Sequence, residues 1–403
     1  MTTSEHSSSG AQATSPPTST SGGDKPLTIR HPQGDDAPSL LPQRAPEGSR
    51  SPSMTPSYTS PRDIIQDMIN APLRFAALHA FVTVGGPERL AAAGELSGEE
   101  LAARCETNTA IMDQLLSALH CYGIVSLHRG RYRLSPTGMA LLPDADDSMH
   151  AAVKVTGSSL WWQAAGTLHQ TVRTGHPAVL DGARDPYERL ADEPELSELS
   201  ELFDQFMASR SAAVGRDLAS LADGFVGAQT VTDLGGGQGG VLAAILHAHP
   251  TLRGVLVERA DVVARARAYL TDQGLSDRTT VEVGDIFSVV SPGAQRYLLS
   301  SILHNWSDLE CVTLLSLIRT AMRDSGPDAE LWCIEATKPA QPGIYSPTID
   351  LGLRMMAMFP GGKERTQEEL LALMEQAGLR CRTTQSLAHG QSLLIAVPAE
   401  AGN

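Results

Sequence analysis

Residues that could hold a nucleoside ligand lie in the C-terminal half of the chain. Gly235, Gly237 and Gly240 in "VTDLGGGQGGVLAAIL" satisfy the pattern G-x-G-x-x-G. Glycines at this spacing let the backbone turn tightly and pass close to a ligand at the carboxyl edge of a parallel sheet. Glu258 ends the next apolar run, "GVLVER", where a carboxylate can accept hydrogen bonds from both ribose hydroxyls. The loop and this acid fit a dinucleotide and S-adenosylmethionine equally well.

Two aspartates favour S-adenosylmethionine. Asp285 ends a third run, "VEVGDIF", and in methyltransferases an acid at this place meets the adenine amino group while the next apolar residue covers the ring. Asp233, directly before the glycines, departs from a typical nicotinamide loop. It could support the loop or approach the positively charged methionine end. The loop and the acids at successive strand ends together predict an adenosyl site.

His304 in "LLSSILHNWSD" is the candidate for acid–base chemistry. A phenol has a pKa near ~10, so a histidine in hydrogen-bond reach could take its proton during methyl transfer. An acid such as Glu335 would fix the ring tautomer and stabilise the imidazolium. By spacing alone a structural role at a helix start is favoured, because Ser307 and Glu310 form a capping box there.

Strands and helices must position these groups. From about residue 228 short apolar runs alternate with helical segments, which predicts an α/β fold with a parallel, doubly wound sheet. The end of the chain, "TTQSLAHGQSLLIAV", predicts two antiparallel strands that turn near Gly390 and finish the sheet. Lys363 and Arg365, on either side of Glu364, are expected to form local charge pairs.

The N-terminal half predicts two helical regions. Residues 61–150 read as short helices followed by a hairpin that turns at Gly130, a winged-helix pattern. Residues 151–220 also look helical, and their bulky side chains pack in a core or wall a pocket. Residues 1–60, rich in Ser, Thr, Pro and Gly, predict a disordered tail. The domains expected are therefore 1–60, 61–150, 151–220 and 221–403.

Charge and cysteine content exclude several classes of protein. The formal net charge is −15, which repels phosphate backbones, so a dimerisation module is preferred to a nucleic-acid-binding one. The five cysteines are dispersed without C-x-x-C spacing, which argues against a disulfide framework or a zinc site. No run approaches the length of a membrane span, and no apolar signal core opens the chain. A cytoplasmic protein without a metal is expected.

Five motifs carry a family resemblance: "DLGGGQGG", "VGDIF", "LLSSILHNWSD", "CIEAT" and "FPGGKERT". In this order they resemble the class I small-molecule O-methyltransferases, which include plant caffeate-type enzymes and bacterial enzymes of natural-product biosynthesis. The resemblance runs from about residue 61 to the end of the chain. It implies a Rossmann-like methyltransferase domain. It also implies an N-terminal winged-helix-like domain that forms an intertwined homodimer and contributes to the partner's pocket.

The resemblance also implies residue roles. Asp233, Gly235, Gly237 and Ser300 would contact S-adenosylmethionine, and plant members carry a lysine in place of Ser300. Glu258 would hold the ribose of the cofactor. Asp285 and Ile286 would contact the adenine. His304 would be the catalytic base, flanked by Glu335 and Glu364. The substrate would be bound by Phe203, Met207, Asn305 and Met355.

Residue 305 departs from the usual family motif, His-Asp-Trp, because this chain reads His304-Asn305-Trp306. An amide can still form hydrogen bonds, but it supplies no negative charge. Some bacterial members also have Asn here. This departure leaves the expected fold and cofactor unchanged. It concerns only the exact role of His304.

Four functions remain open at this stage. The leading one is methylation of a hydroxyl, expected to be phenolic, on a small natural product or aromatic molecule. The second is methylation at carbon or nitrogen on the same fold. The third is a nicotinamide-dependent oxidoreductase that uses the glycine loop, and the fourth is a ligand-sensing transcription factor built on the winged-helix part.

Overall fold

The computed structural model describes residues 60–400 apart from 181–185, 289 and 388–389. The predicted tail, up to residue 59, lies outside the described residues. Within them, no helix combines the length and apolar character needed to cross a membrane.

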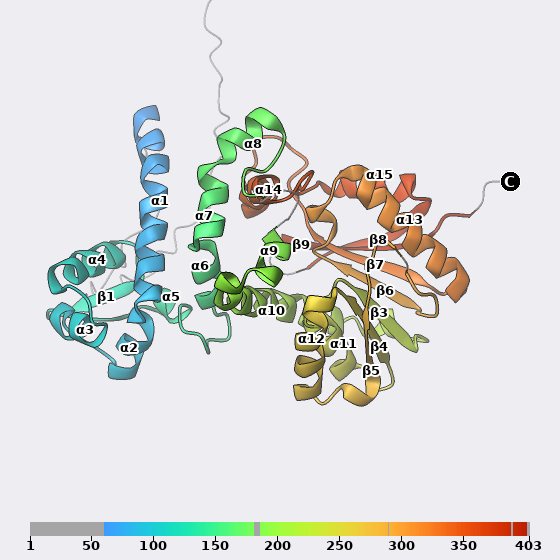
Figure 1. Cartoon of the computed structure of the whole chain (residues 1–403), viewed down its shortest axis with the longest axis horizontal. Helices are drawn as coiled ribbons and strands as arrows, with labels where there is room; N and C mark the ends of the chain where they lie inside the picture. Colours follow the sequence, from blue (N-terminus) through green and yellow to red (C-terminus); the bar gives the residue numbers. More distant parts are fainter. Residues whose placement is uncertain (1–59, 181–185, 289, 388–389, 401–403) are drawn as a thin grey trace, which may run out of the picture. The chain divides into compact units, whose positions relative to one another are not determined.

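The N-terminal part holds helices followed by a hairpin, as predicted (Figure 1). Ser60 caps the first helix, and Ser97 and Glu100 close a capping box at the third. The hairpin turns at Arg129 and Gly130, which both have positive φ, as tight two-residue turns require. The elements are α1 (Pro61–Thr83), α2 (Gly86–Ala93), α3 (Gly98–Arg104), α4 (Thr109–Cys121), β1 (Val125–His128), β2 (Arg131–Leu134) and α5 (Pro136–Met139).

A group of helices follows and shares an apolar core with a later helix, α14 (Pro347–Met358). Trp161, Phe203, Met355 and Phe359 belong to this core, and Tyr187 joins the rings of Phe203 and Phe359 with centroids 5.5 and 5.0 Å away. Of the bulky side chains in this region, Trp161, Phe203 and Phe206 pack in this core, whereas Trp162 is 43% exposed. The helices are α6 (His150–Thr156), α7 (Ser159–Gly166), α8 (Leu168–Thr174), α9 (Pro186–Asp192) and α10 (Ser197–Ala219).

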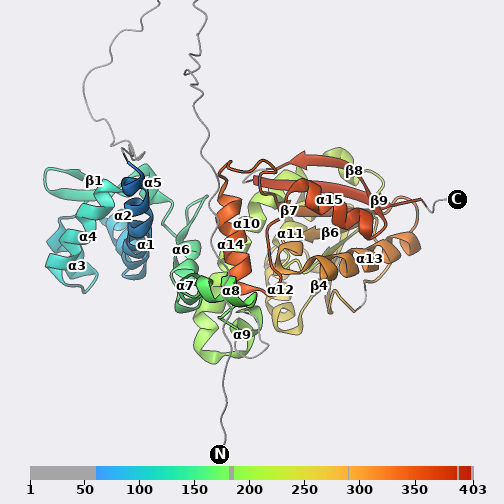
Figure 2. The same cartoon turned by 90° about the horizontal axis from the view of Figure 1, so that it is seen from above.

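The C-terminal part is a seven-stranded sheet in the order β5-β4-β3-β6-β7-β9-β8, labelled in Figure 1 and seen from above in Figure 2. Neighbours from β5 to β7 are parallel, while β9 is antiparallel to both β7 and β8. The α/β class and the final antiparallel pair are confirmed. The strands are β3 (Thr230–Leu234), β4 (Arg253–Glu258), β5 (Thr279–Val283), β6 (Arg296–Ser300), β7 (Glu330–Ala336), β8 (Leu379–Ser386) and β9 (Gln391–Pro398).

Helices cover both faces of this sheet. Buried residues of α13 (Asp308–Ser325) and α15 (Gln367–Gln376) form one core with one face. Residues of α10, α11 (Gly240–Ala248) and α12 (Ala260–Asp272) form the other. Because β3 to β7 are parallel, the loops that follow them meet at one edge of the sheet, which is where ligands bind in such folds.

Candidate active site

A cavity of about 500 Å³ lies at the ends of the parallel strands. Glu258 and Asp285 both face it, from the ends of neighbouring strands. The structure therefore brings together all the residues for which cofactor contact was expected, and with them three of the four expected substrate residues. The shared lining comprises Asp233, Gly235, Gly237, Glu258, Asp285, Ile286, Ser300, Phe203, Met207 and Asn305.

The glycine loop turns directly after β3. Gly235 and Gly237 have φ values of +69° and +61°, a region that favours glycine. A Cβ at Gly235 would lie 2.8 Å from Cδ1 of Ile302, whereas one at Gly237 would meet nothing within 4 Å. A side chain at residue 237 would instead enter the space that a ligand needs. The loop thus presents bare backbone to the cavity.

Asp233 is fully buried beneath this loop, and neither of its carboxylate oxygens has a hydrogen-bond partner. Burial, with the nearby charge of Glu258, raises the pKa of Asp233 to about 7. A buried carboxylate without a partner is costly. A positively charged ligand group in the adjoining cavity would offset that cost, so this observation fits the cationic methionine end of S-adenosylmethionine.

The two acids at the next strand ends are held by backbone. Glu258 accepts hydrogen bonds from the amides of Gly237 at 3.0 Å and Arg259 at 2.7 Å, and burial raises its pKa. Asp285 is exposed and accepts from the amide of Phe287 and the hydroxyl of Ser288. Each carboxylate oxygen has a second lone pair, so both acids keep acceptor capacity for hydroxyl or amino donors of a ligand.

Sequence reasoning missed two features of the cavity wall. Phe287 and Trp306 pack edge to face in the cavity wall, with ring centroids 4.6 Å apart. Each directly follows a predicted site residue, Ile286 or Asn305, and this adjacency in sequence could have indicated their position. Asp204 and Arg265 form an ion pair at 2.6 Å across the cavity lining. Nothing in the spacing of two helical residues so far apart in sequence pointed to that pair.

His304 lies in a short 3-10 segment after β6 and is buried. Its Nδ1 lies 2.8 Å from Oε1 of Glu364 and 3.8 Å from Oε2 of Glu335. Burial by itself disfavours the imidazolium, but the hydrogen bond to Glu364 and the charges of both glutamates outweigh it, so the pKa of His304 is raised. The structure thus brings together the three residues for which acid–base roles were expected.

Glu335 is fixed at the end of β7. Its Oε1 accepts hydrogen bonds from the amides of Ile302 at 2.9 Å and Leu303 at 2.7 Å. Burial is the main reason that its pKa is raised, to about 6, while the charge of His304 opposes the shift. The acid therefore positions the backbone before His304 as well as facing its ring.

These three groups place ligand-type atoms within 4.8 Å of one another, a spacing that could also surround a metal ion. The separation of 2.8 Å between Nδ1 of His304 and Glu364 is that of a charge-assisted hydrogen bond. The expectation of a site without a metal stays a prediction.

His304 and Met355 line a second, smaller hollow between α10 and α14. Phe203 and Met207 line both hollows, so the imidazole lies in the part of the site that adjoins the larger cavity. Met355 is also part of the apolar core described above. Asn305 turns to the larger cavity, and its buried Oδ1 has no hydrogen-bond partner.

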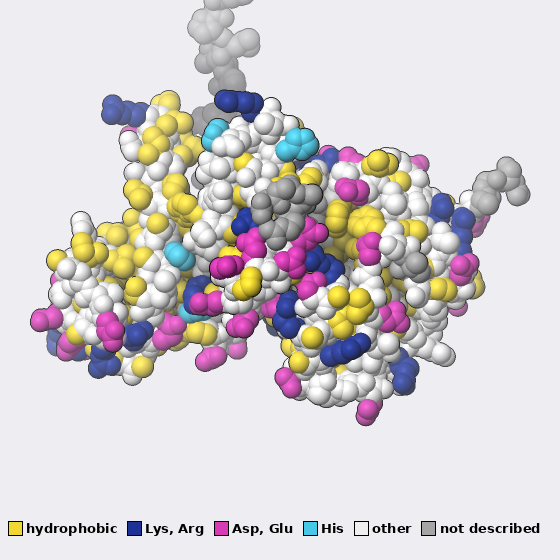
Figure 3. All heavy atoms as spheres, viewed as in Figure 1, with side chains coloured by type: hydrophobic (Ala, Val, Ile, Leu, Met, Phe, Trp, Pro, Cys, Tyr) yellow, Lys and Arg dark blue, Asp and Glu magenta, His cyan; other side chains and the backbone are white. Residues whose placement is uncertain are grey.

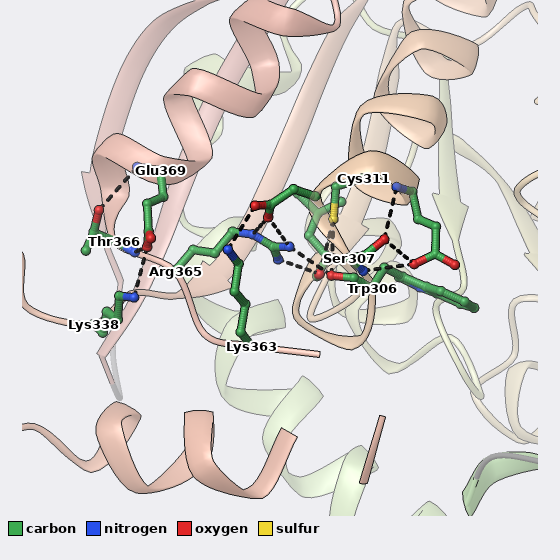
Figure 4. A network of polar contacts seen from close by, with 11 residues as sticks. Trp306, Ser307, Cys311, Lys338, Lys363, Arg365, Thr366 and Glu369 are labelled. Carbon is green, nitrogen blue, oxygen red and sulfur yellow. Dashed lines mark hydrogen bonds and ion pairs between the residues drawn. The ribbon is translucent and has the colours of Figure 1, made fainter. Parts of the chain in front are cut away.

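Arg365 clamps the loop after α14 onto the segment that carries His304 (Figure 4). Its buried guanidinium donates to the carbonyls of Leu303 at 2.7 Å and Trp306 at 2.8 Å, and it pairs with Asp308. Lys363 also pairs with Asp308, at 2.9 Å. The predicted charge pairs exist, but their partner is Asp308 rather than the adjacent glutamate. This clamp holds Glu364 against His304.

Comparisons with known proteins identify the family of this chain. The O-methyltransferase domain family matches residues 175–380. The mitomycin biosynthesis 6-O-methyltransferase of Streptomyces lavendulae is 30% identical over 345 residues, covering 85% of this chain and 96% of that protein. The 8-amino-8-demethylriboflavin N,N-dimethyltransferase of Streptomyces davaonensis is 29% identical, covering 81% of this chain and 92% of that protein. The solved structure of CalO1, a methyltransferase in calicheamicin biosynthesis bound to SAH, matches with a TM-score of 0.72 and 30% identity, covering 84% of this chain and 98% of that one.

The contacts of Arg365 and Lys363 predict that substituting these two residues lowers the stability of the protein by unequal amounts. Arg365→Met removes a buried, charged donor from the carbonyls of Leu303 and Trp306, which keep only the contacts with the Trp306 amide and the weakly donating Cys311 thiol. Hydrogen bonds to charged groups contribute about 1.5–3 kcal/mol each, so we expect a clear loss of unfolding free energy in urea titrations. Lys363→Met is the matched control, because it removes an exposed ion pair with the same aspartate, and such pairs contribute at most ~1 kcal/mol. Equal losses for the two variants would contradict the clamp.

Proposed function

Because this chain belongs to the O-methyltransferase family and uses S-adenosylmethionine as its cofactor, we propose that it methylates a hydroxyl of phenolic type on a small natural product, with His304 as general base. The observation that carries the proposal is a buried imidazole whose Nδ1 is held by Glu364 at 2.8 Å. This contact leaves Nε2 as the ring nitrogen available to an acceptor. The family assignment replaces the nicotinamide oxidoreductase considered from the glycine loop.

The residues around the larger cavity support specific roles toward the cofactor. When bound, S-adenosylmethionine supplies an electrophilic methyl group on a sulfonium. Asp233 would face its positively charged methionine end, Glu258 would hold the ribose hydroxyls, and Asp285 with Ile286 would hold the adenine. Gly235 and Gly237 would pass close to the cofactor, and Ser300 would add a hydroxyl contact.

His304 performs the proton transfer in this proposal. As the acceptor oxygen is methylated, its proton moves to Nε2, and Glu364 and Glu335 stabilise the imidazolium that forms. Such a base contributes roughly 10²–10⁴-fold. Holding the acceptor oxygen at attack distance can contribute a further ~7–11 kcal/mol. Phe203, Met207 and Met355 form an apolar wall around the acceptor.

Asn305 would bind the acceptor rather than strengthen the base. Its side-chain oxygen is buried without a partner and lies in the wall of the larger cavity. A neutral amide can accept a hydrogen bond from the acceptor, but it does not raise the pKa of His304. The two glutamates carry that function alone.

Methylation at nitrogen is the second candidate, because a relative over most of this chain's length is an N,N-dimethyltransferase. An amine acceptor already has an exposed lone pair and needs no base before attack. His304→Ala therefore separates the two reactions. O-methylation of a phenol falls steeply in this variant, whereas methylation of an amine is largely kept.

The acid pair predicts the pH dependence of O-methylation. A base must be neutral, so the rate is lost as the pH falls through the pKa of His304, which lies above its usual value of 6.5. Glu364→Gln removes a charge that raises this pKa and replaces a charge-assisted hydrogen bond by a weaker neutral one, so the acidic limb of the kcat/KM profile shifts to lower pH. In a screen of phenols that measures SAH release, His304→Ala lowers the rate ~10²–10⁴-fold.

The control is His247→Ala, which alters an exposed histidine on α11 and leaves the profile unchanged. A Glu364→Gln profile that coincides with the wild-type profile would refute the proposed role of the acid.

Asp233 predicts proton-linked cofactor binding. Its pKa of about 7 means that the cationic ligand meets a partly protonated carboxyl at neutral pH, so affinity increases as the pH rises through 7. From pH ~6 to ~8 the affinity for SAH in calorimetry increases up to about tenfold. Asp233→Asn removes the pH dependence of SAH affinity. Asp285→Asn weakens SAH binding but leaves its pH dependence unchanged. An affinity independent of pH in the wild-type protein would contradict this role.

We also propose that the protein is a homodimer through residues 61–150. Five large apolar side chains of α1 are between 46% and 70% exposed, and hydrophobic side chains follow this helix in Figure 3. They recur at helical spacing, and an exposed apolar face of this kind marks a protein interface. The residues are Ile64, Ile65, Met68, Ile69 and Leu73.

The dimer is tested by its mass in solution. Light scattering after size exclusion gives twice the chain mass for the wild-type protein. A double variant, Met68→Glu with Ile69→Glu, gives a monomer, because charges are not tolerated in a dry interface. Val172→Glu on α8, which changes an exposed apolar residue outside residues 61–150, stays dimeric. A wild-type monomer would disprove the proposal.

A further inference from the structure

Two arginines that the proposed reaction does not use line the smaller hollow beside His304. Arg210 comes from α10 and Arg354 from α14. Both side chains are partly buried. They share this wall with Phe203, Met207 and Met355, the residues proposed to enclose the acceptor.

Neither guanidinium forms a hydrogen bond or an ion pair with any residue that the structure describes. The nearest acid along α14 is Asp350, one turn before Arg354, and this exposed residue accepts a hydrogen bond from the hydroxyl of Tyr345 at 2.9 Å. Arg210 lies over the ring of Phe206, 5.9 Å from its centroid. The other arginines named in the site, Arg265 and Arg365, pair with aspartates.

The two positive charges act on each other and on the base. Burial and then the charge of Arg210 lower the pKa of Arg354. Arg210 also opposes protonation of His304. Like charges close together in a half-buried wall are unfavourable unless an anion joins them. The glutamates beside His304 do not fill this role, because they form no ion pair with either arginine.

A planar guanidinium matches a carboxylate because it can donate two parallel hydrogen bonds. The position of the pair, in the apolar wall and next to the base, is suited to an anionic group on the ring that bears the reacting hydroxyl. We propose that Arg210 and Arg354 form a subsite for a carboxylate, so that the protein selects hydroxylated aromatic acids over their neutral analogues. This inference rests on the proposed function and names its class of acceptor.

The hollow is small, about 30 Å³, so an aromatic ring enters it only when neighbouring side chains move apart. Methionines and phenylalanines form its walls, and methionine adapts readily to a new shape. Without an ionic contact, a carboxylate would weaken binding to such an apolar wall. A preference for the acid is therefore a specific sign of the subsite.

The test measures binding by the full chain saturated with SAH. The probes are 3-hydroxy-2-naphthoate and its neutral methyl ester, which share the ring and the hydroxyl. We expect the wild-type protein to bind the acid at least about tenfold more tightly than the ester. Arg354→Gln and Arg210→Gln each bring the ratio of the acid and ester affinities close to one. Arg354→Lys keeps part of the preference for the acid. Arg380→Gln, which changes an exposed arginine in β8, keeps the full preference for the acid.

The affinity for SAH is measured for every variant and stays unchanged, because neither arginine lines the larger cavity. Absence of SAH binding would refute the proposed function. Intact SAH binding with equal affinities for acid and ester, or with no binding of the acid at millimolar concentration, would overturn the carboxylate subsite alone. A preference that survives in Arg354→Gln and Arg210→Gln would also overturn it.

Discussion

The structure of this site depends on a buried imidazole held between two carboxylates. Removing a histidine from water disfavours its charged form, yet Glu364 at 2.8 Å and Glu335 at 3.8 Å reverse the balance and raise its pKa. Each acid is held by other parts of the chain. Backbone amides of the histidine segment hold Glu335, and the loop that Arg365 clamps carries Glu364. The imidazole is therefore held by elements that come from three separate parts of the chain.

The parallel sheet imposes the second constraint. Strands β3, β4 and β5 end at one edge, so the glycine loop, Glu258 and Asp285 meet around one cavity although they are distant in sequence. β6 and β7 end at the same edge and bring His304 and Glu335 together, and His304 lines the adjoining hollow. The proposed cofactor site and the proposed base thus adjoin without any loop having to reach across the fold.

Sequence alone could predict much of this arrangement, because the determining signals are local. The glycines, the acids at strand ends and the capping serines each sit within a few residues of the element that they define. Long-range pairings could not be predicted. Lys363 and Arg365 lie next to Glu364, yet both pair with Asp308. Arg210 and Arg354 would be taken for surface residues of helices, and only packing of α10 against the α14 region places them in one wall.

The central claim is that the two glutamates prepare His304 as a base. The most direct measurement is an NMR titration of the imidazole in the SAH complex, in the wild-type protein and in Glu364→Gln. We predict a transition above the ordinary value of 6.5 in the wild-type protein and a lower one in the variant. A transition at or below 6.5 that is the same in both proteins would contradict the account.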